Sequence, residues 1–266
     1  MATMAIGKAW EEAVAFVRRE ATLLFPVAML FVALPSVLLG EMTPPELSAW
    51  AVEPVKSGPP PVSGTYALTV LISVLLVWFG SLTLFALALR PGISVAEALR
   101  LSLSRLPVLI GTTMLAGGVL ALAMILVAML SVLVAPVPAA TGLIILVTGG
   151  LAIFGGVRLL LLNPVVIDGQ DGVLVSLRRS WALTKGHFWR LAGFMALLVL
   201  VSGIAAGAAQ AVLGIIGGLL GGPSMARLIG GIGAAAVSTV VQVYMLAVLA
   251  RLYRQTQPQD VAGVFR

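Results

Sequence analysis

The chain of 266 residues has no cysteine, a single histidine and only 10% charged residues. Without cysteine it can form neither disulfides nor thiolate metal sites, and one histidine cannot supply a two-histidine metal site. Soluble proteins carry about 25% charged residues, which they need to cover a surface that faces water. The scarcity of charge therefore excludes an ordinary soluble domain.

Hydrophobic residues, in contrast, make up 60% of the chain, and the mean hydropathy is +1.12. A helix needs about 20 apolar residues to cross a hydrocarbon core of about 30 Å. Six stretches reach that length, at 21–40, 66–89, 107–134, 139–162, 189–218 and 226–250. Each is continuously apolar rather than alternating, which favours helices over strands. The sequence predicts an all-α polytopic integral membrane protein, a single transmembrane domain over 1–266 with six helices in three hairpins.

Lysine and arginine are distributed unevenly among the connecting segments. One set of segments carries 14 of the 16 basic residues, and the opposite loops carry only Lys56 and Arg227. Such an asymmetry places the basic side in the cytoplasm, and both termini with it. The net charge is +6, but the basic residues lie beside apolar runs, where anionic lipid headgroups are their expected partners. No nucleic-acid partner is expected.

A short amphipathic stretch precedes three of the predicted spans and begins near residues 8, 94 and 173. Ser94 and Glu97 have the spacing of an N-terminal capping box. The apolar stripes are formed by Trp10, Val14, Val17 and Ala21, by Val95, Leu99, Leu103 and Leu106, and by Leu174, Leu177 and Trp181. Two interpretations stay open. The chain contains three internal repeats at 8–90, 94–162 and 173–254, each a cytoplasmic interfacial helix followed by a hairpin, or these are the basic flanks of any multi-span protein.

Motifs for catalysis or metal binding are nearly absent. Asp168 and Asp171 form a close acidic pair beside glycines, which either binds a divalent cation weakly or forms a turn with Asp171 as the N-cap of the next helix. The turn is the favoured interpretation. An enzyme acting on headgroups would need both aspartates and His187 to converge. We therefore expect no enzyme activity, and assign no catalytic residue, cofactor or metal site.

Glycines recur at four-residue spacing in the fifth predicted span and just after it. Those assigned to helix packing are Gly203, Gly207, Gly214, Gly217, Gly218 and Gly221. Small residues at this spacing let membrane helices approach closely, within one chain or across a homo-oligomer. Flexibility for a moving gate is the alternative.

The segment 158–194, RLLLLNPVVIDGQDGVLVSLRRSWALTKGHFWRLAGF, resembles the glycerophosphoryl diester phosphodiesterase membrane domain family of bacterial six-span inner-membrane proteins. The closing Arg251-Leu-Tyr-Arg254 is similar to the usual end of that family. The resemblance implies a bacterial inner-membrane protein. The family takes its name from members fused to a catalytic phosphodiesterase, whose histidine and glutamate pairs this sequence does not have, so no catalytic residue is carried over.

Together these features predict a non-enzymatic inner-membrane protein that binds membrane lipids, anionic ones in particular, or organises partner proteins. The alternative is a transporter or flippase-like protein for a lipid or a small neutral solute. The candidate headgroup contacts gather with two tryptophans in one short segment and are Arg158, Arg178, Arg179, Lys185 and Arg190.

Overall fold

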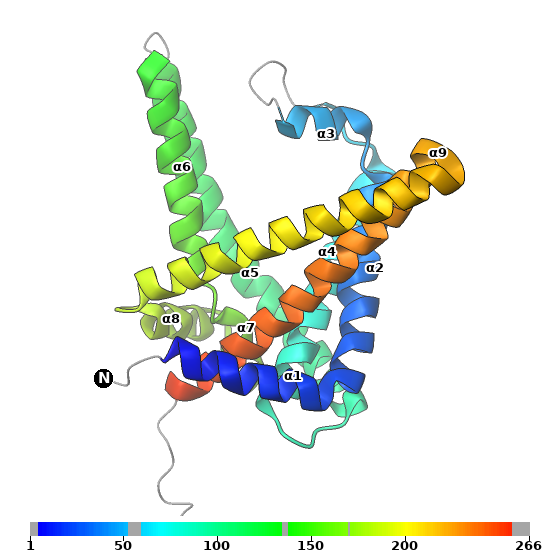
Figure 1. Cartoon of the computed structure of the whole chain (residues 1–266). Helices are drawn as coiled ribbons and strands as arrows, with labels where there is room; N and C mark the ends of the chain where they lie inside the picture. Colours follow the sequence, from blue (N-terminus) through cyan, green and yellow to red (C-terminus); the bar gives the residue numbers. More distant parts are fainter. Residues whose placement is uncertain (1–4, 53–59, 135–137, 170, 257–266) are drawn as a thin grey trace, which may run out of the picture. The chain divides into compact units, whose positions relative to one another are not determined.

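The computed structural model describes residues 5–52, 60–134, 138–169 and 171–256, and this part of the chain forms helices and no strand (Figure 1). The all-α prediction is confirmed. In chain order the elements are α1 (Ile6–Ala28), the π-helix η1 (Met29–Ala33), α2 (Leu34–Met42), α3 (Pro45–Val52), α4 (Gly64–Leu89), α5 (Val95–Val134), α6 (Pro138–Arg158), α7 (Leu162–Asp168), α8 (Val173–Thr184) and α9 (Phe188–Thr256).

Five helical stretches of the described chain are long and apolar enough to cross a membrane, namely Ile6–Met42, Gly64–Leu89, Val95–Val127, Leu146–Asp168 and Phe188–Thr256. This is compatible with a polytopic membrane protein. The difference from the predicted six lies in α9, which contains both of the last two predicted spans and is interrupted at Gly221 and Gly222. Six crossings in three hairpins remain a prediction. Lys56 lies outside the described residues.

The three amphipathic stretches are joined to the following helices in different ways. In α1 the backbone leaves helical geometry at Glu20, with φ −103° and ψ 15°, where the apolar part begins. The second stretch runs into its span without a break, because α5 is one helix of 40 residues. The third is the separate helix α8, which ends before Gly186, a glycine with φ +86°. Ser94 and Glu97 form the predicted capping box, with Ser94 N donating to Glu97 Oε2 at 2.9 Å and Glu97 N donating to Ser94 Oγ at 3.2 Å.

In these stretches small residues are buried at four-residue spacing: Ala9, Ala13 and Val17; Ala98 and Ser102; and Ser176, Ser180 and Thr184. Bulky members of the predicted apolar stripes are exposed instead, with exposed fractions of 40% for Trp10, 63% for Leu103, 60% for Leu174 and 45% for Trp181. An exposed apolar stripe beside charged residues is what an interfacial helix presents to lipid.

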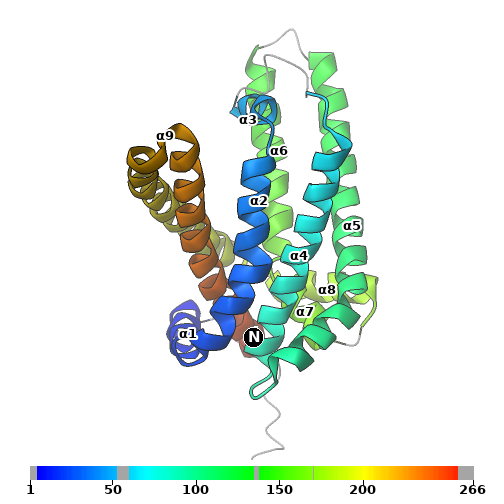
Figure 2. The same cartoon turned by 90° about the vertical axis from the view of Figure 1, so that its right-hand side faces the viewer.

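The chain divides into two compact units, each of which combines distant segments. Unit 1 consists of Met1–Ala13, Phe85–Leu197 and Val248–Arg266, and unit 2 of Val14–Leu84 and Leu198–Ala247. In unit 1, α5 and α6 lie side by side in both views, and α7 and α8 pack against α5 (Figures 1 and 2). The buried side chains of α7 are apolar, as is the buried Leu161 that precedes it; those of α7 are Leu162, Pro164, Val165, Val166 and Ile167.

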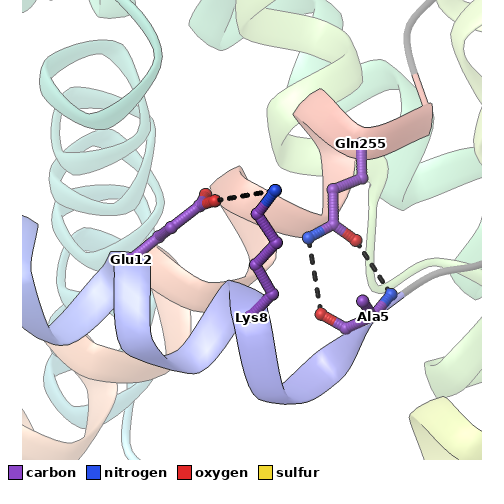
Figure 3. Close-up of polar contacts among 4 residues, drawn as sticks. All are labelled: Ala5, Lys8, Glu12 and Gln255. Carbon is purple, nitrogen blue, oxygen red and sulfur yellow. Dashed lines mark hydrogen bonds and ion pairs between the residues drawn. The ribbon is translucent and has the colours of Figure 1, made fainter.

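Side-chain hydrogen bonds tie distant parts of unit 1 together. Tyr253 Oη donates to Asp168 Oδ2 at 2.9 Å, and Arg254 Nη2 donates to Leu89 O at 2.7 Å. Gln255 holds the start of α1 with both ends of its amide, since its Oε1 accepts from Ala5 N at 3.0 Å and its Nε2 donates to Ala5 O at 3.4 Å (Figure 3). The last turns of α9 are therefore fixed to three other segments of unit 1.

In unit 2, α9 turns back on itself at its interruption. Gly222 has φ +75°, a conformation that residues with a side chain rarely adopt, and Pro223 begins the second arm. The two arms come into contact at glycines, which have no side chain to hold the backbones apart. A Cβ on Gly217 would lie 2.5 Å from Met225 O, and one on Gly230 would lie 2.8 Å from Gln210 O.

Candidate functional site

The structure separates the five candidate headgroup residues into two groups. Arg178, Lys185 and Arg190 are exposed, whereas Arg158 and Arg179 are half-buried. The three exposed cations form no ion pair with any residue that the structure describes. Together with the exposed Trp181 and Trp189 they form what we call the basic surface of unit 1.

Arg158, the last residue of α6, is engaged within the protein. Its guanidinium carbon lies 5.1 Å from the ring centre of Phe154 and 5.0 Å from that of Trp181, which is cation–π distance. Its Nη1 donates to Trp181 O at 3.4 Å and to Thr184 Oγ1 at 3.5 Å. Ser180 Oγ donates to the Arg158 carbonyl at 3.0 Å. Arg158 thus joins the end of α6 to α8.

Arg179 is paired as well, with its Nη1 3.5 Å from Asp171 Oδ2. The prediction that Asp171 is the N-cap of α8 is wrong. The N-cap of α8 is Gly172, which has no side chain to form a capping hydrogen bond. Asp171 precedes it, and its carboxylate reaches two turns along the helix to Arg179 instead.

Aromatic side chains form a continuous row beside these cations. Ring centres lie 5.6 Å apart for Trp181 and Phe154, 5.4 Å for Phe154 and Phe188, and 5.2 Å for Phe188 and Trp189. Trp189, at the end of the row, has an exposed fraction of 84%. Tryptophans that combine an apolar ring with an N–H group are typical of the membrane–water interface. The row therefore connects the two tryptophans of the basic surface through Phe154 and Phe188.

Of the three residues that an enzyme acting on headgroups would need, the two aspartates are engaged in other contacts. Asp168 accepts the hydrogen bond of Tyr253, Asp171 pairs with Arg179, and Nδ1 of His187 is buried with no hydrogen-bond partner in the described part of the chain. Among the described residues no group of three or more histidine, aspartate or glutamate side chains could hold a metal ion.

The six glycines assigned to packing also fall into two groups. Gly214, Gly217, Gly218 and Gly221 face Met225 or Ala226 in the second arm of α9, whereas Gly203 and Gly207 have open space where a Cβ would lie. Close contacts also occur at Gly80, against Phe31, and at Gly233, against Leu213. Neither of these belonged to the predicted set, because a glycine's partner on another helix cannot be read from spacing alone.

Unit 2 contains a cavity of about 350 Å³ between η1–α2 and the second arm of α9. Its polar lining residues are Ser36, Glu41, Ser238, Thr239 and Gln242. Glu41 lies at the end of α2, and Gln242 lies in the second arm of α9. The two lie about 200 positions apart in the chain, and only the fold brings them to one cavity.

Residues 4–256 match the family described as a domain of unknown function, DUF7847. The chain belongs to this family. The match runs through α1 to α9 and therefore includes both units. No curated protein and no solved structure matches the chain.

The description of the DUF7847 family names no activity, so a function is inferred from the residues of this chain. The resemblance of residues 158–194 to the glycerophosphoryl diester phosphodiesterase membrane domain family remains a prediction. The segment that carries this resemblance also contains the basic surface and three of the four rings of the aromatic row, Trp181, Phe188 and Trp189.

Proposed function

We propose that this protein is a non-enzymatic protein of the bacterial inner membrane, with cytoplasmic termini, that binds anionic lipid headgroups through the basic surface of unit 1. The observation that carries the proposal is the exposure of Arg178, Lys185 and Arg190 without ion pairs to the described residues. Two exposed tryptophans border them. A cluster of unpaired cations beside interfacial aromatics suits a surface that meets lipid phosphates.

The expected strength of this interaction follows from the number of free cations. Each basic side chain near an anionic membrane surface contributes about 1 kcal/mol. Three such residues would contribute about 3 kcal/mol, or roughly a hundredfold in affinity. Arg158 and Arg179 are left out of this sum, because their guanidinium groups already have partners in the protein.

The test compares retained lipids by native mass spectrometry of protein released from nanodiscs of phosphatidylglycerol and phosphatidylcholine. The wild-type protein should retain phosphatidylglycerol preferentially. Neutralising all three cations, with Arg178→Gln, Lys185→Gln and Arg190→Gln, should weaken that preference by roughly tenfold to a hundredfold, since three favourable contacts are removed.

A second triple variant controls for net charge, because it removes the same number of exposed cations elsewhere. It combines Arg90→Gln, Arg100→Gln and Arg227→Gln, and it should leave the lipid preference unchanged. Equal loss in both triples would contradict a specific surface. A preference that survives the first triple, with another protein co-purifying, would favour the organisation of partner proteins instead.

Transport of a lipid or a small solute is the second candidate function. The cavity of unit 2 favours it, because polar groups are rare in apolar helices and line solute paths when they occur. Movement of labelled lipids or solutes across reconstituted vesicles would support transport, and movement no faster than in empty vesicles would count against it.

A further inference from the structure

The polar side of the unit 2 cavity consists largely of hydrogen-bond acceptors. Ser36 Oγ donates its proton to Val32 O at 2.7 Å, and Thr239 Oγ1 donates to Ala235 O at 2.7 Å. A hydroxyl that has already used its proton offers only lone pairs to a third group. Gln242 adds an amide oxygen to these two acceptors, together with amide N–H groups, and Ser238 adds a hydroxyl that can accept or donate.

The charge of the lining has one sign. Glu41 is the only ionisable residue among the described residues that line the cavity, and none of these is basic. A phosphate or carboxylate would meet a carboxylate and hydroxyl lone pairs, with no cation on the described part of the lining to neutralise it. A cation with several N–H donors would find a counter-charge and matching acceptors.

The rest of the lining is apolar and small. Val32, Val37, Ala234 and Ala235 line it together with Gly40 and Gly231. The volume of about 350 Å³ lies at the lower end of the range of roughly 300–1,000 Å³ for ligand pockets. A short aliphatic chain fits these walls better than a ring system or a sugar.

We propose that this cavity binds a primary ammonium group on a short aliphatic chain. Glu41 supplies the counter-charge, Ser36, Thr239 and Gln242 accept its N–H groups, and the apolar walls hold the chain. This inference is independent of lipid binding by the basic surface, which involves other residues and the opposite charge. A free amine and the ethanolamine headgroup of a lipid share the required chemistry.

The first experiment titrates the purified full-length protein in nonionic detergent by isothermal titration calorimetry. The probes are butylammonium chloride, 1-butanol and sodium butyrate, which share one chain length and differ in the polar group. Butylammonium should bind at least about tenfold more tightly than butanol, as a charged hydrogen bond is lost in the alcohol. Butyrate should not bind. Equal affinities for the amine and the alcohol would overturn the proposal.

Variants then assign the binding to the cavity. Glu41→Gln should weaken butylammonium binding by about tenfold or more, because the counter-charge is removed. Glu46→Gln, which neutralises an exposed carboxylate of α3 outside the lining, is the matched control and should bind normally. Ala235→Leu, which fills the apolar side, should abolish binding in protein that still elutes as a folded species. Normal binding by Glu41→Gln, or the same loss in Glu46→Gln, would contradict the assignment.

The last experiment distinguishes the two sources of the amine. Native mass spectrometry from nanodiscs compares retention of phosphatidylethanolamine with that of phosphatidylcholine, whose quaternary ammonium has no N–H group. Preferential retention of phosphatidylethanolamine that Glu41→Gln abolishes would identify the lipid headgroup. Binding of butylammonium without any such preference would identify a free amine.

Discussion

The two units of this protein differ in the contacts that stabilise each of them internally. Unit 1 relies on side-chain hydrogen bonds between residues distant in sequence, such as Tyr253 to Asp168 and Arg254 to Leu89. In unit 2 helices meet at glycines such as Gly217 and Gly230. Hydroxyls that bond to a carbonyl of their own helix occur in both units, as Thr239 and Ser102 do.

The difference reflects what stabilises contacts between helices in lipid. Apolar side chains gain little by leaving a hydrocarbon solvent, so close packing and hydrogen bonds have to supply the stability. The hydrogen bonds of unit 1 lie at helix ends, and the glycine contacts of unit 2 lie within apolar helix. Close glycine contacts also occur in unit 1, such as that of Gly111 against Val173, so the two units differ in how much they use each kind of contact.

The largest effect is expected in unit 2. Gly217→Ala would place a methyl group 2.5 Å from Met225 O, a backbone atom that cannot rotate away. We expect a loss of about 2–3 kcal/mol, or about 5–10 °C in the melting temperature in detergent. Gly203→Ala is the matched control, since nothing lies within 4 Å of its Cβ position, and its melting temperature should stay the same or rise. Equal effects would show that close glycine contact does not stabilise unit 2.

An intermediate effect is expected in unit 1. Tyr253→Phe removes the hydrogen bond to Asp168 and leaves the buried ring in place, which should lower the free energy of unfolding by about 1 kcal/mol. Tyr66→Phe removes the longer contact of 3.2 Å with Thr43 in unit 2. Thermal denaturation should give a smaller change for Tyr66→Phe. A larger change for Tyr66→Phe than for Tyr253→Phe would contradict the expectation that side-chain hydrogen bonds stabilise unit 1 more than unit 2.

The smallest effect is expected at the capping box that starts α5. Ser94→Ala removes the hydroxyl bonded to Glu97 N, and the melting temperature should fall by about 2 °C. Ser104→Ala serves as the control, because Ser104 is exposed and only bonds back to Leu101 O in its own helix. Equal changes in these two variants would mean that the cap adds nothing beyond an ordinary surface hydroxyl.

Much of the helical structure was predictable, because continuous apolar runs and the capping box of Ser94 depend on neighbouring residues only. The buried face of each amphipathic stretch was not. Small residues such as Ala98 and Ser180 are inside while Leu103 and Leu174 are exposed, since in lipid the bulky apolar side chains have no reason to turn inward.

For the candidate sites as well, local patterns were predictable and distances through space were not. The basic segment around Arg178 was visible as a local cluster of charge. The pairing of Arg179 with Asp171, the position of Arg158 between two rings and the cavity that joins Glu41 to Gln242 all depend on distances through space. Spacing in the sequence cannot supply these distances.

The interruption of α9 has a topological consequence. As one straight helix, its 69 residues would extend about 100 Å, more than three times the hydrocarbon thickness of about 30 Å. The turn at Gly222, with φ +75°, divides it into two arms of about 50 Å each. If both arms cross the bilayer, α9 adds an even number of crossings, and residue 256 returns to the face from which the helix started. In that case a single glycine dihedral sets the parity of the crossings, and with it the side of the membrane on which residue 256 lies.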